Sequence, residues 1–323
     1  MVLLNKILNK FIGFYYPQEY LCLSKESFGQ PLSVYAVEDN KVIEDVTKRH
    51  AFVGYCPLVF CIDSERKQLL PKNITIVFAP VPLELHARIG KKDIVARLEL
   101  REVAEFGGGG ERFRLYEGVK GKHRFISSIK QLAGDIHNKL YKQKAGNVFL
   151  KGNLLKQVQI AYAVPRNVSL ITVGQDRTYN LFPTDLHGEA GCEHYIISLR
   201  HAGKACAQVV ETGRILVSEM EAKYFKQVYS LGKNHMQPLK EASAFTFSSG
   251  RSSCFDLPVP DGATYLRELE LKDSFVAGIH RIMLFKVKGT EKRNANAGTL
   301  AHVHNVYATW RYKQGVESNY LLR

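Results

Sequence analysis

The chain repeats part of its own sequence, and this repeat constrains the fold more than any other feature. Val37 and Val173 end two similar apolar stretches 136 positions apart, and Cys56 and Cys192 follow at the same spacing. The matching stretches are 32–37 with 168–173, 59–63 with 195–199, 98–101 with 269–272, and 119–121 with 287–289. The later pairs have larger offsets, so insertions separate the blocks. Because each repeat is one structural unit and such units usually pack on each other, we expect two similar modules in one chain.

The length of the chain agrees with two modules. It has 323 residues, and domains cluster at roughly 100 to 150 residues. With 45% hydrophobic and 24% charged residues, the composition is that of an ordinary globular protein. The polar stretch 142–146 ends in glycine and forms a plausible linker from the first half to the second. We therefore place a boundary near residue 150 and predict domains at 1–150 and 151–323.

Short apolar runs bounded by turn residues dominate both halves, a pattern typical of β-strands. In the first half these runs cover 32–37, 58–62, 74–79, 94–100 and 113–116. In the second half they cover 158–164, 168–173, 195–199, 214–218, 265–271 and 282–288. Gly107–Gly110 predicts a hairpin loop and not a phosphate-binding loop, because no helical pattern follows it.

Three segments predict helices between the strands. Apolar residues at helical spacing and a capping box formed by Ser128 and Gln131 predict a helix over 128–141. The segments 203–210 and 219–231 predict two shorter helices. Antiparallel strands with a few helices indicate a mainly β fold, and we expect a small closed β-barrel.

The charge of the chain favours anionic ligands. The formal net charge is +14, which attracts phosphate-bearing ligands, nucleic acid or anionic lipid without choosing among them. Basic residues alternate with acids, as where Lys48 and Arg49 follow Glu44 and Asp45, and no long basic run occurs. This pattern is typical of solvated surfaces and not of a nucleic-acid-binding arm, so we do not expect nucleic acid as a partner.

The histidines, the cysteines and the N-terminal segment add three expectations. The six cysteines form no C-x-x-C pair and match neither zinc-site nor disulfide-rich spacing. His302 and His304 share one strand face and could join His280, but no acid or cysteine completes a metal set, so we expect packing or hydrogen bonding. Residues 1–16 predict a short amphipathic helix and not a signal peptide, with an interfacial membrane helix as the alternative. We expect a cytoplasmic protein without a metal and without membrane association.

The turn after the strand 195–199 has the residues of a phosphate site. Ser198 and Arg200 end the strand, and Gly203 and Lys204 begin the predicted helix. Helix starts present backbone N–H groups, an arginine binds two phosphate oxygens at once, and a glycine allows close backbone approach. The alternative is a solvated turn after an edge strand.

Six stretches of the second half, in order, resemble motifs of the flavin reductase-like family of FMN-binding split barrels. The stretches are 165–172, 178–184, 196–204, 211–218, 257–263 and 278–280. The resemblance covers roughly residues 155 to 315. It implies a split β-barrel with a flavin whose phosphate lies at the turn described above and whose ring and ribityl chain lie along 180–186.

The resemblance implies FMN as the cofactor, with FAD as the alternative, and NAD(P)H as the co-substrate. The implied cofactor-binding residues are Asn180, Leu181, Phe182, Pro183, Thr184, Asp185, Leu186, Ser198, Leu199, Arg200, Gly203, Lys204 and His280. No catalytic side chain is implied, because the flavin performs the chemistry. The family usually has Ser or Thr near Asp185. An unpaired carboxylate there would repel a reduced, anionic flavin, so we expect Asp185 to face solvent or to modify the site.

The first repeat lacks the cations of the second. Asp63 and Glu65 follow its strand where Arg200 follows the matching strand, and an acidic turn repels phosphate. We therefore expect a degenerate barrel without a cofactor of its own. The resemblance implies homodimers with the flavin at the subunit interface, and two fused split barrels would form such an interface within one chain as a pseudo-dimer.

These observations lead to a main hypothesis and two alternatives. We expect a flavin reductase-like oxidoreductase that passes hydride or electrons from NAD(P)H through flavin to a second acceptor. The first alternative is a flavin-binding sensor or carrier without turnover, suggested by the altered loop around Asp185. The second is a nucleic-acid-binding protein, suggested only by the net charge. The sequence does not identify the acceptor.

Overall fold

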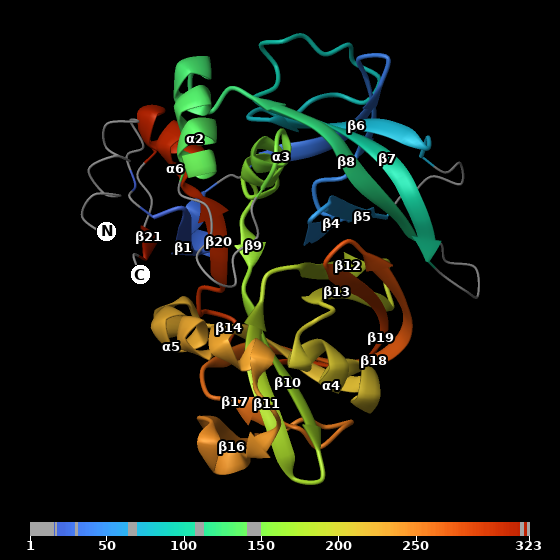
Figure 1. Cartoon of the computed structure of the whole chain (residues 1–323), viewed down its shortest axis with the longest axis vertical. Helices are drawn as coiled ribbons and strands as arrows, with labels where there is room; N and C mark the ends of the chain where they lie inside the picture. The colour runs from blue at the N-terminus through green and yellow to red at the C-terminus, as the bar shows by residue number, and fades with distance from the viewer. Residues whose placement is uncertain are drawn as a thin grey trace.

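A computed structural model of the chain describes residues 16, 18–29, 32–63, 70–106, 113–140, 150–316 and 320–321. The predicted helix over 1–16 lies outside these residues except for its last position, and the predicted Gly107–Gly110 loop lies wholly outside them. Two β-rich parts follow each other along the long axis of the molecule, with a small sheet and most helices beside them (Figure 1).

The first sheet contains seven strands in the order β3-β2-β6-β7-β8-β5-β4, and all its pairs are antiparallel. Its strands are β2 Ser33–Glu38, β3 Lys41–Asp45, β4 His50–Tyr55, β5 Leu58–Ile62, β6 Asn73–Ala79, β7 Ala96–Phe106 and β8 Phe113–His123. Every residue of β5 is buried, and a strand covered on both faces reads as a continuous apolar run. This explains why 58–62 is so apolar.

The second sheet contains eight strands in the order β12-β13-β19-β18-β14-β10-β11-β15. They are β10 Ser169–Gln175, β11 Thr178–Thr184, β12 His187–Ala190, β13 His194–Arg200, β14 Arg214–Met220, β15 Lys240–Glu241, β18 Ala263–Ala277 and β19 His280–Lys292. Without the short β15 this is the strand order of the first sheet, read from the opposite edge. The first hairpins also agree, because each turns through two residues with positive φ, Asp39–Asn40 and Asp176–Arg177, as type I′ turns do.

The remaining elements surround these two sheets. A four-stranded sheet joins β21 Tyr320–Leu321, β1 Tyr20–Ser24, β20 Leu300–His304 and β9 Arg166–Asn167, and a separate hairpin joins β16 Phe247–Arg251 to β17 Pro258–Pro260. The α-helices are α2 Ser128–Leu140, α3 Leu154–Ala161, α4 Lys204–Thr212, α5 Phe225–Ser230 and α6 Asn305–Lys313. Short 3-10 turns are η1 Glu26–Phe28, η2 Ala222–Tyr224, η3 Leu231–Met236 and η4 Ala242–Ala244. No described helix is both long and apolar enough to cross a membrane.

Most predicted elements are confirmed, two expectations are wrong, and one is confirmed only in part. Residues 158–164 lie largely in helix α3 and not in a strand, because nearly all of that helix is buried and its apolar run hides the helical period. The predicted helix over 219–231 is confirmed in part: residues 222–231 are helical, in η2, α5 and the start of η3, but β14 continues to Met220. The closed barrel is also wrong: the described ladders form open sheets. Alternating apolar strands are common to open and closed sheets, so closure is not encoded in that pattern.

The two large sheets meet through β4, which packs against β12 and β13. A Cβ atom added to Gly188 would lie 2.7 Å from the Cβ of Ala51, so the two backbones approach closely there. One apolar core is shared by both sheets, with Val53 and Val59 from the first and Ile196 and Ile282 from the second. The contact between the halves is therefore a packed hydrophobic interface.

The C-terminal segment crosses back to the first half. Val303 of β20 and Tyr307 of α6 are buried in the same core as the strands of the first sheet. Helix α3 packs on β8, where added Cβ atoms at Gly118 and Gly121 would meet the side chain of Gln157. The boundary near residue 150 stays a prediction, and the helix that follows it packs on the first half.

Candidate functional site

The predicted phosphate turn lies at the start of helix α4. Strand β13 ends at Arg200 and α4 begins at Lys204, and both side chains are exposed. Gly203 is buried, and its N–H donates to the carbonyl of Arg200 at 2.9 Å. A Cβ atom at this position would lie 3.2 Å from that carbonyl oxygen and 3.3 Å from the carbonyl oxygen of His235. The tight turn brings two cations to the positive end of the helix dipole.

Arg200 is bound by a residue of the other half of the chain. Its Nε and Nη2 atoms donate to the hydroxyl oxygen of Tyr55 at 3.1 and 2.6 Å. The guanidinium carbon lies 5.8 Å from the centre of the Tyr55 ring. Burial raises the pKa of the Tyr55 hydroxyl, so it remains a neutral acceptor at neutral pH. The end of β4 therefore determines where the Arg200 side chain lies.

Ser198 and His280 form a buried pair behind Arg200. The hydroxyl of Ser198 lies 3.1 Å from Nδ1 of His280, and the His280 ring meets the Tyr55 ring edge-on at 4.8 Å. Burial, followed by the charge of Arg200, lowers the pKa of His280 to about 4. His280 is therefore neutral at physiological pH. Leu199 is buried in the core of the second sheet, so its side chain does not face the turn.

Backbone contacts fix the three segments relative to one another. The N–H of Ile279 donates to the carbonyl of Cys56 at 3.2 Å, and the N–H of His201 donates to the carbonyl of Ile279 at 3.1 Å. Gly278 has φ 57° and presses against Cys56, so that any Cβ atom there would overlap the Cys56 carbonyl. The tip of the β18–β19 hairpin is thus held between the β4–β5 hairpin and the start of α4.

The predicted ring-binding strand is mostly covered by its own chain. Asn180 is fully buried, and its Nδ2 atom donates to Gln208 Oε1 at 2.8 Å and to the Asn234 carbonyl at 3.0 Å. The carbonyl of Pro183 accepts from Nε2 of His235 at 2.8 Å. The segment η3 therefore lies along this part of β11.

The apolar side chains of this strand do not form one surface. Leu181 is buried against Val228, Phe182 is buried in the core of the second sheet, and Leu186 lies in the core of the first half. Neighbouring residues of a strand point to opposite faces, which explains the separation of Leu181 and Phe182. Thr184 accepts from the N–H of Leu186 at 3.3 Å. Their part in flavin binding stays a prediction.

The expectation that Asp185 faces solvent is wrong, because its carboxylate is mostly buried and paired, and the alternative that it modifies the site stays a prediction. Its Oδ2 atom lies 2.8 Å from the hydroxyl of Tyr162 and 2.9 Å from Nδ1 of His302. Burial raises the pKa of Asp185, but the bonds from His302 and Tyr162 outweigh it and lower the pKa below its usual value. This pairing was not predictable from local sequence, because the partners lie 23 and 117 positions away.

The other histidines are explained by local contacts. Nδ1 of His304 accepts from the N–H of Val306 and so caps α6. Within the described residues, no cluster of three or more His, Cys, Asp or Glu side chains could hold a metal ion. The expectation of packing or hydrogen bonding for His280, His302 and His304 is confirmed.

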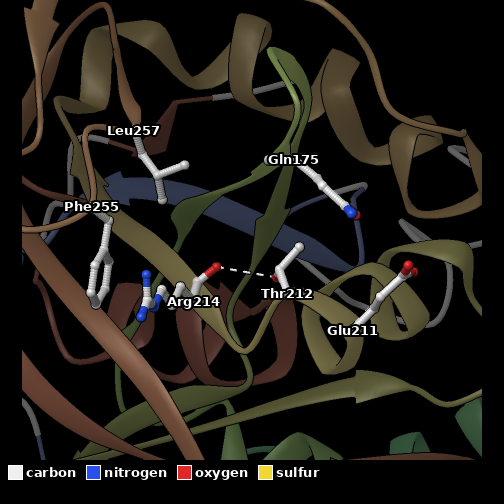
Figure 2. Close-up of a pocket in the computed structure, with 7 residues that line it drawn as sticks. Gln175, Glu211, Thr212, Arg214, Phe255 and Leu257 are labelled. Atoms are coloured by element: carbon white, nitrogen blue, oxygen red, sulfur yellow. Dashed lines mark hydrogen bonds between the residues drawn. The ribbon is translucent and has the colours of Figure 1, made fainter.

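A shallow hollow of about 350 Å³ lies at the other end of α4 (Figure 2). It is lined by Gly174, Gln175, Glu211, Thr212, Arg214, Phe255 and Leu257. The Arg214 guanidinium lies over the Phe255 ring at 5.5 Å, as Figure 2 shows. None of the predicted cofactor-binding residues lines this hollow, so it is separate from the candidate site.

The residues at the start of α4 fit a phosphate better than the residues of β11 fit a ring. Arg200 and Lys204 are exposed cations beside a tight turn in which Gly203 allows two backbone carbonyls to approach closely. By contrast, the side chains of Asn180, Leu181 and Phe182 are buried and used within the protein. Tyr55 was missed by the sequence reasoning because only the tertiary contact brings it to Arg200.

Comparison with known proteins found structural neighbours only. No protein-family model matches the chain, and no curated protein matches it. One neighbour is the NADH:FAD oxidoreductase SgcE6 of Streptomyces globisporus C-1027, with 17% identity, a TM-score of 0.42, and coverage of 51% of this chain and 96% of that protein. Another is BorF, the flavin reductase component of a bacterial two-component tryptophan halogenase, with 17% identity, a TM-score of 0.40, and coverage of 46% and 92%.

A third neighbour is an FMN-binding protein from Thermus thermophilus, with 16% identity and a TM-score of 0.39. That match covers 51% of this chain and 96% of the neighbour. The three neighbours are thus an NADH:FAD oxidoreductase, a flavin reductase component and an FMN-binding protein.

Proposed function

We propose that the chain binds a flavin nucleotide through its phosphate at the start of α4. The observation that carries this proposal is the pair of exposed cations, Arg200 and Lys204, on either side of the buried Gly203. An arginine and a lysine beside a helix start are well suited to a phosphate dianion. FMN is the preferred ligand because its phosphate is terminal, and FAD is the alternative.

The proposed activity is that of a flavin reductase-like oxidoreductase using NAD(P)H. A bound flavin would supply the hydride chemistry, so the protein needs to bind and orient the cofactor and not to donate a proton. Behind Arg200, the neutral His280 and the hydroxyl of Ser198 form a buried pair that carries no charge.

We further propose that the two halves are a fused pseudo-dimer with one flavin site. The equal strand order of the two large sheets and their matching first turns support a duplication. The first half would bind no flavin of its own, because acidic residues, Asp63 and Glu65, follow its strand at the turn where the second half has Arg200.

A flavin-binding module without turnover remains the second candidate. The burial of Asn180 and the pairing of Asp185 with His302 favour it, because both side chains of the segment predicted to bind the ring are used within the protein. Anaerobic addition of NADH or NADPH to the flavin-loaded protein separates the candidates. Loss of the yellow absorbance supports the reductase, and a spectrum that does not change supports the module without turnover.

The binding proposal is tested by titrating FMN and riboflavin into the protein while following flavin fluorescence. We expect FMN to bind more tightly than riboflavin, and the double variant Arg200→Glu with Lys204→Glu to lose this difference. The matched control reverses two exposed cations far from the turn, Lys91→Glu with Lys92→Glu. If the Arg200 and Lys204 variant retains FMN as well as the control does, the proposal is wrong.

A further inference from the structure

The two halves of the chain meet at the proposed phosphate site through one side-chain contact. Tyr55 ends β4 of the first sheet, and Arg200 ends β13 of the second sheet. The Tyr55 hydroxyl accepts from both Nε and Nη2 of Arg200, at 3.1 and 2.6 Å. One edge of the guanidinium is therefore held by a residue from the half that we propose to have no flavin of its own.

Tyr55 is itself held in place by the contact between the halves. Its ring meets the His280 ring at 4.8 Å. The next residue, Cys56, accepts from the N–H of Ile279 and lies against Gly278. The hydroxyl thus occupies a fixed position relative to the start of α4, so Arg200 is bound to a rigid acceptor.

A fixed acceptor matters because Arg200 is exposed. A solvent-exposed arginine samples many rotamers, and immobilising it when a ligand binds costs conformational entropy. A guanidinium carries five N–H donors, and the bonds to Tyr55 use two of them, Nε and one at Nη2. Orienting Arg200 before the ligand arrives reduces the entropy lost on binding.

We propose that Tyr55 is the positioning residue through which the first half sets the flavin phosphate affinity of the second half. This inference rests on the proposed function and names a residue that acts through Arg200. It makes the site a product of both halves, because neither half contains both members of the pair. It also gives the first half, which lacks counterparts of Arg200 and Lys204, a role in binding the phosphate.

The experiment compares FMN and riboflavin binding to Tyr55→Phe in the full chain. The variant keeps the ring and its contact with His280 and removes only the hydroxyl. We expect FMN affinity to fall about tenfold, the effect of one hydrogen bond to a charged group, and riboflavin affinity to stay unchanged. Tyr35→Phe is the matched control, because Tyr35 is buried in the same sheet and its hydroxyl accepts from the backbone N–H of Leu83 and not from Arg200.

A double-mutant comparison separates positioning from a general structural effect. Lysine keeps the charge but cannot give the two-donor contact to Tyr55. In an Arg200→Lys background we therefore expect Tyr55→Phe to cause no further loss of FMN affinity. A loss that is equal in both backgrounds, or equal for FMN and riboflavin, overturns the inference.

The remaining outcomes are also decisive. If Tyr55→Phe binds FMN as well as the unmodified chain or more tightly, Tyr55 does not position Arg200 for the phosphate, while the proposed function stands. If the unmodified chain shows no preference for FMN over riboflavin, the proposed function fails and this inference fails with it.

Discussion

Gly278 is the position where one substitution should most directly disturb the contact between the two halves. It has φ 57°, a conformation that costs an L-residue about 1–2 kcal/mol. In addition, a new Cβ atom would overlap the carbonyl oxygen of Cys56 and the ring of Pro57. These neighbours are a backbone group and a rigid ring, so they cannot swing away as the end of a long side chain does.

The expected destabilisation combines both effects. Overpacking a fitted contact costs about 1–3 kcal/mol, so Gly278→Ala should lower the free energy of unfolding by about 2–5 kcal/mol. Gly213→Ala is the matched control, because Gly213 has φ 64° and no atom within 4 Å of the added Cβ. The control should lose only the conformational part, about 1–2 kcal/mol.

Urea unfolding followed by circular dichroism measures both variants against the unmodified chain. The difference between the two variants isolates the close contact of the halves from the backbone conformation. If Gly278→Ala and Gly213→Ala lower the free energy of unfolding equally, the β18–β19 tip does not press against Cys56 in solution. The fixed position of Tyr55 would then lose its support.

Three further predictions concern buried ionisable groups. Asp185→Asn should lower the free energy of unfolding by about 2–4 kcal/mol at pH 7, because it removes the anion from a mostly buried pair with His302. The pKa of Asp185 is lowered in the folded protein, so this stability is present above the unfolded pKa of about 3.9 and is lost as the pH falls through the folded pKa. Urea unfolding at several pH values should therefore show a smaller loss of stability at acid pH for the variant than for the unmodified chain. Glu268→Gln should cost about 1.5–3 kcal/mol, since the buried carboxylate accepts from the N–H groups of Cys254 and Phe255; a thermal midpoint equal to that of the unmodified chain would contradict this. The His280 ring should titrate near pH 4 by NMR, and a titration near pH 6.5 would show that the ring is exposed. Because the unfolded chain binds this proton more readily, the contribution of neutral His280 to the free energy of unfolding is complete above about pH 6.5 and is lost as the pH falls through 4.

The strands were predictable because their signal is local. Runs such as 58–62 and 74–79 carry β-branched residues between turn residues, and both became strands at nearly the predicted bounds. Helix α2 was also predictable, because its apolar residues recur at helical spacing with polar residues between them. Helix α3 was not, because a helix buried on nearly all sides has no polar face to reveal its period.

The candidate site divides in the same way. The sequence by itself determined that Arg200, Gly203 and Lys204 lie at the turn after β13. It also determined the repeated strand pattern that brings two similar sheets into one chain. Both features depend on neighbours along the chain. Only the tertiary structure decided that Tyr55 binds Arg200, that Asp185 pairs with His302, and that Leu181 and Phe182 enter separate cores. Those contacts join residues far apart in sequence, and packing between sheets, which no local pattern encodes, selects which of them form.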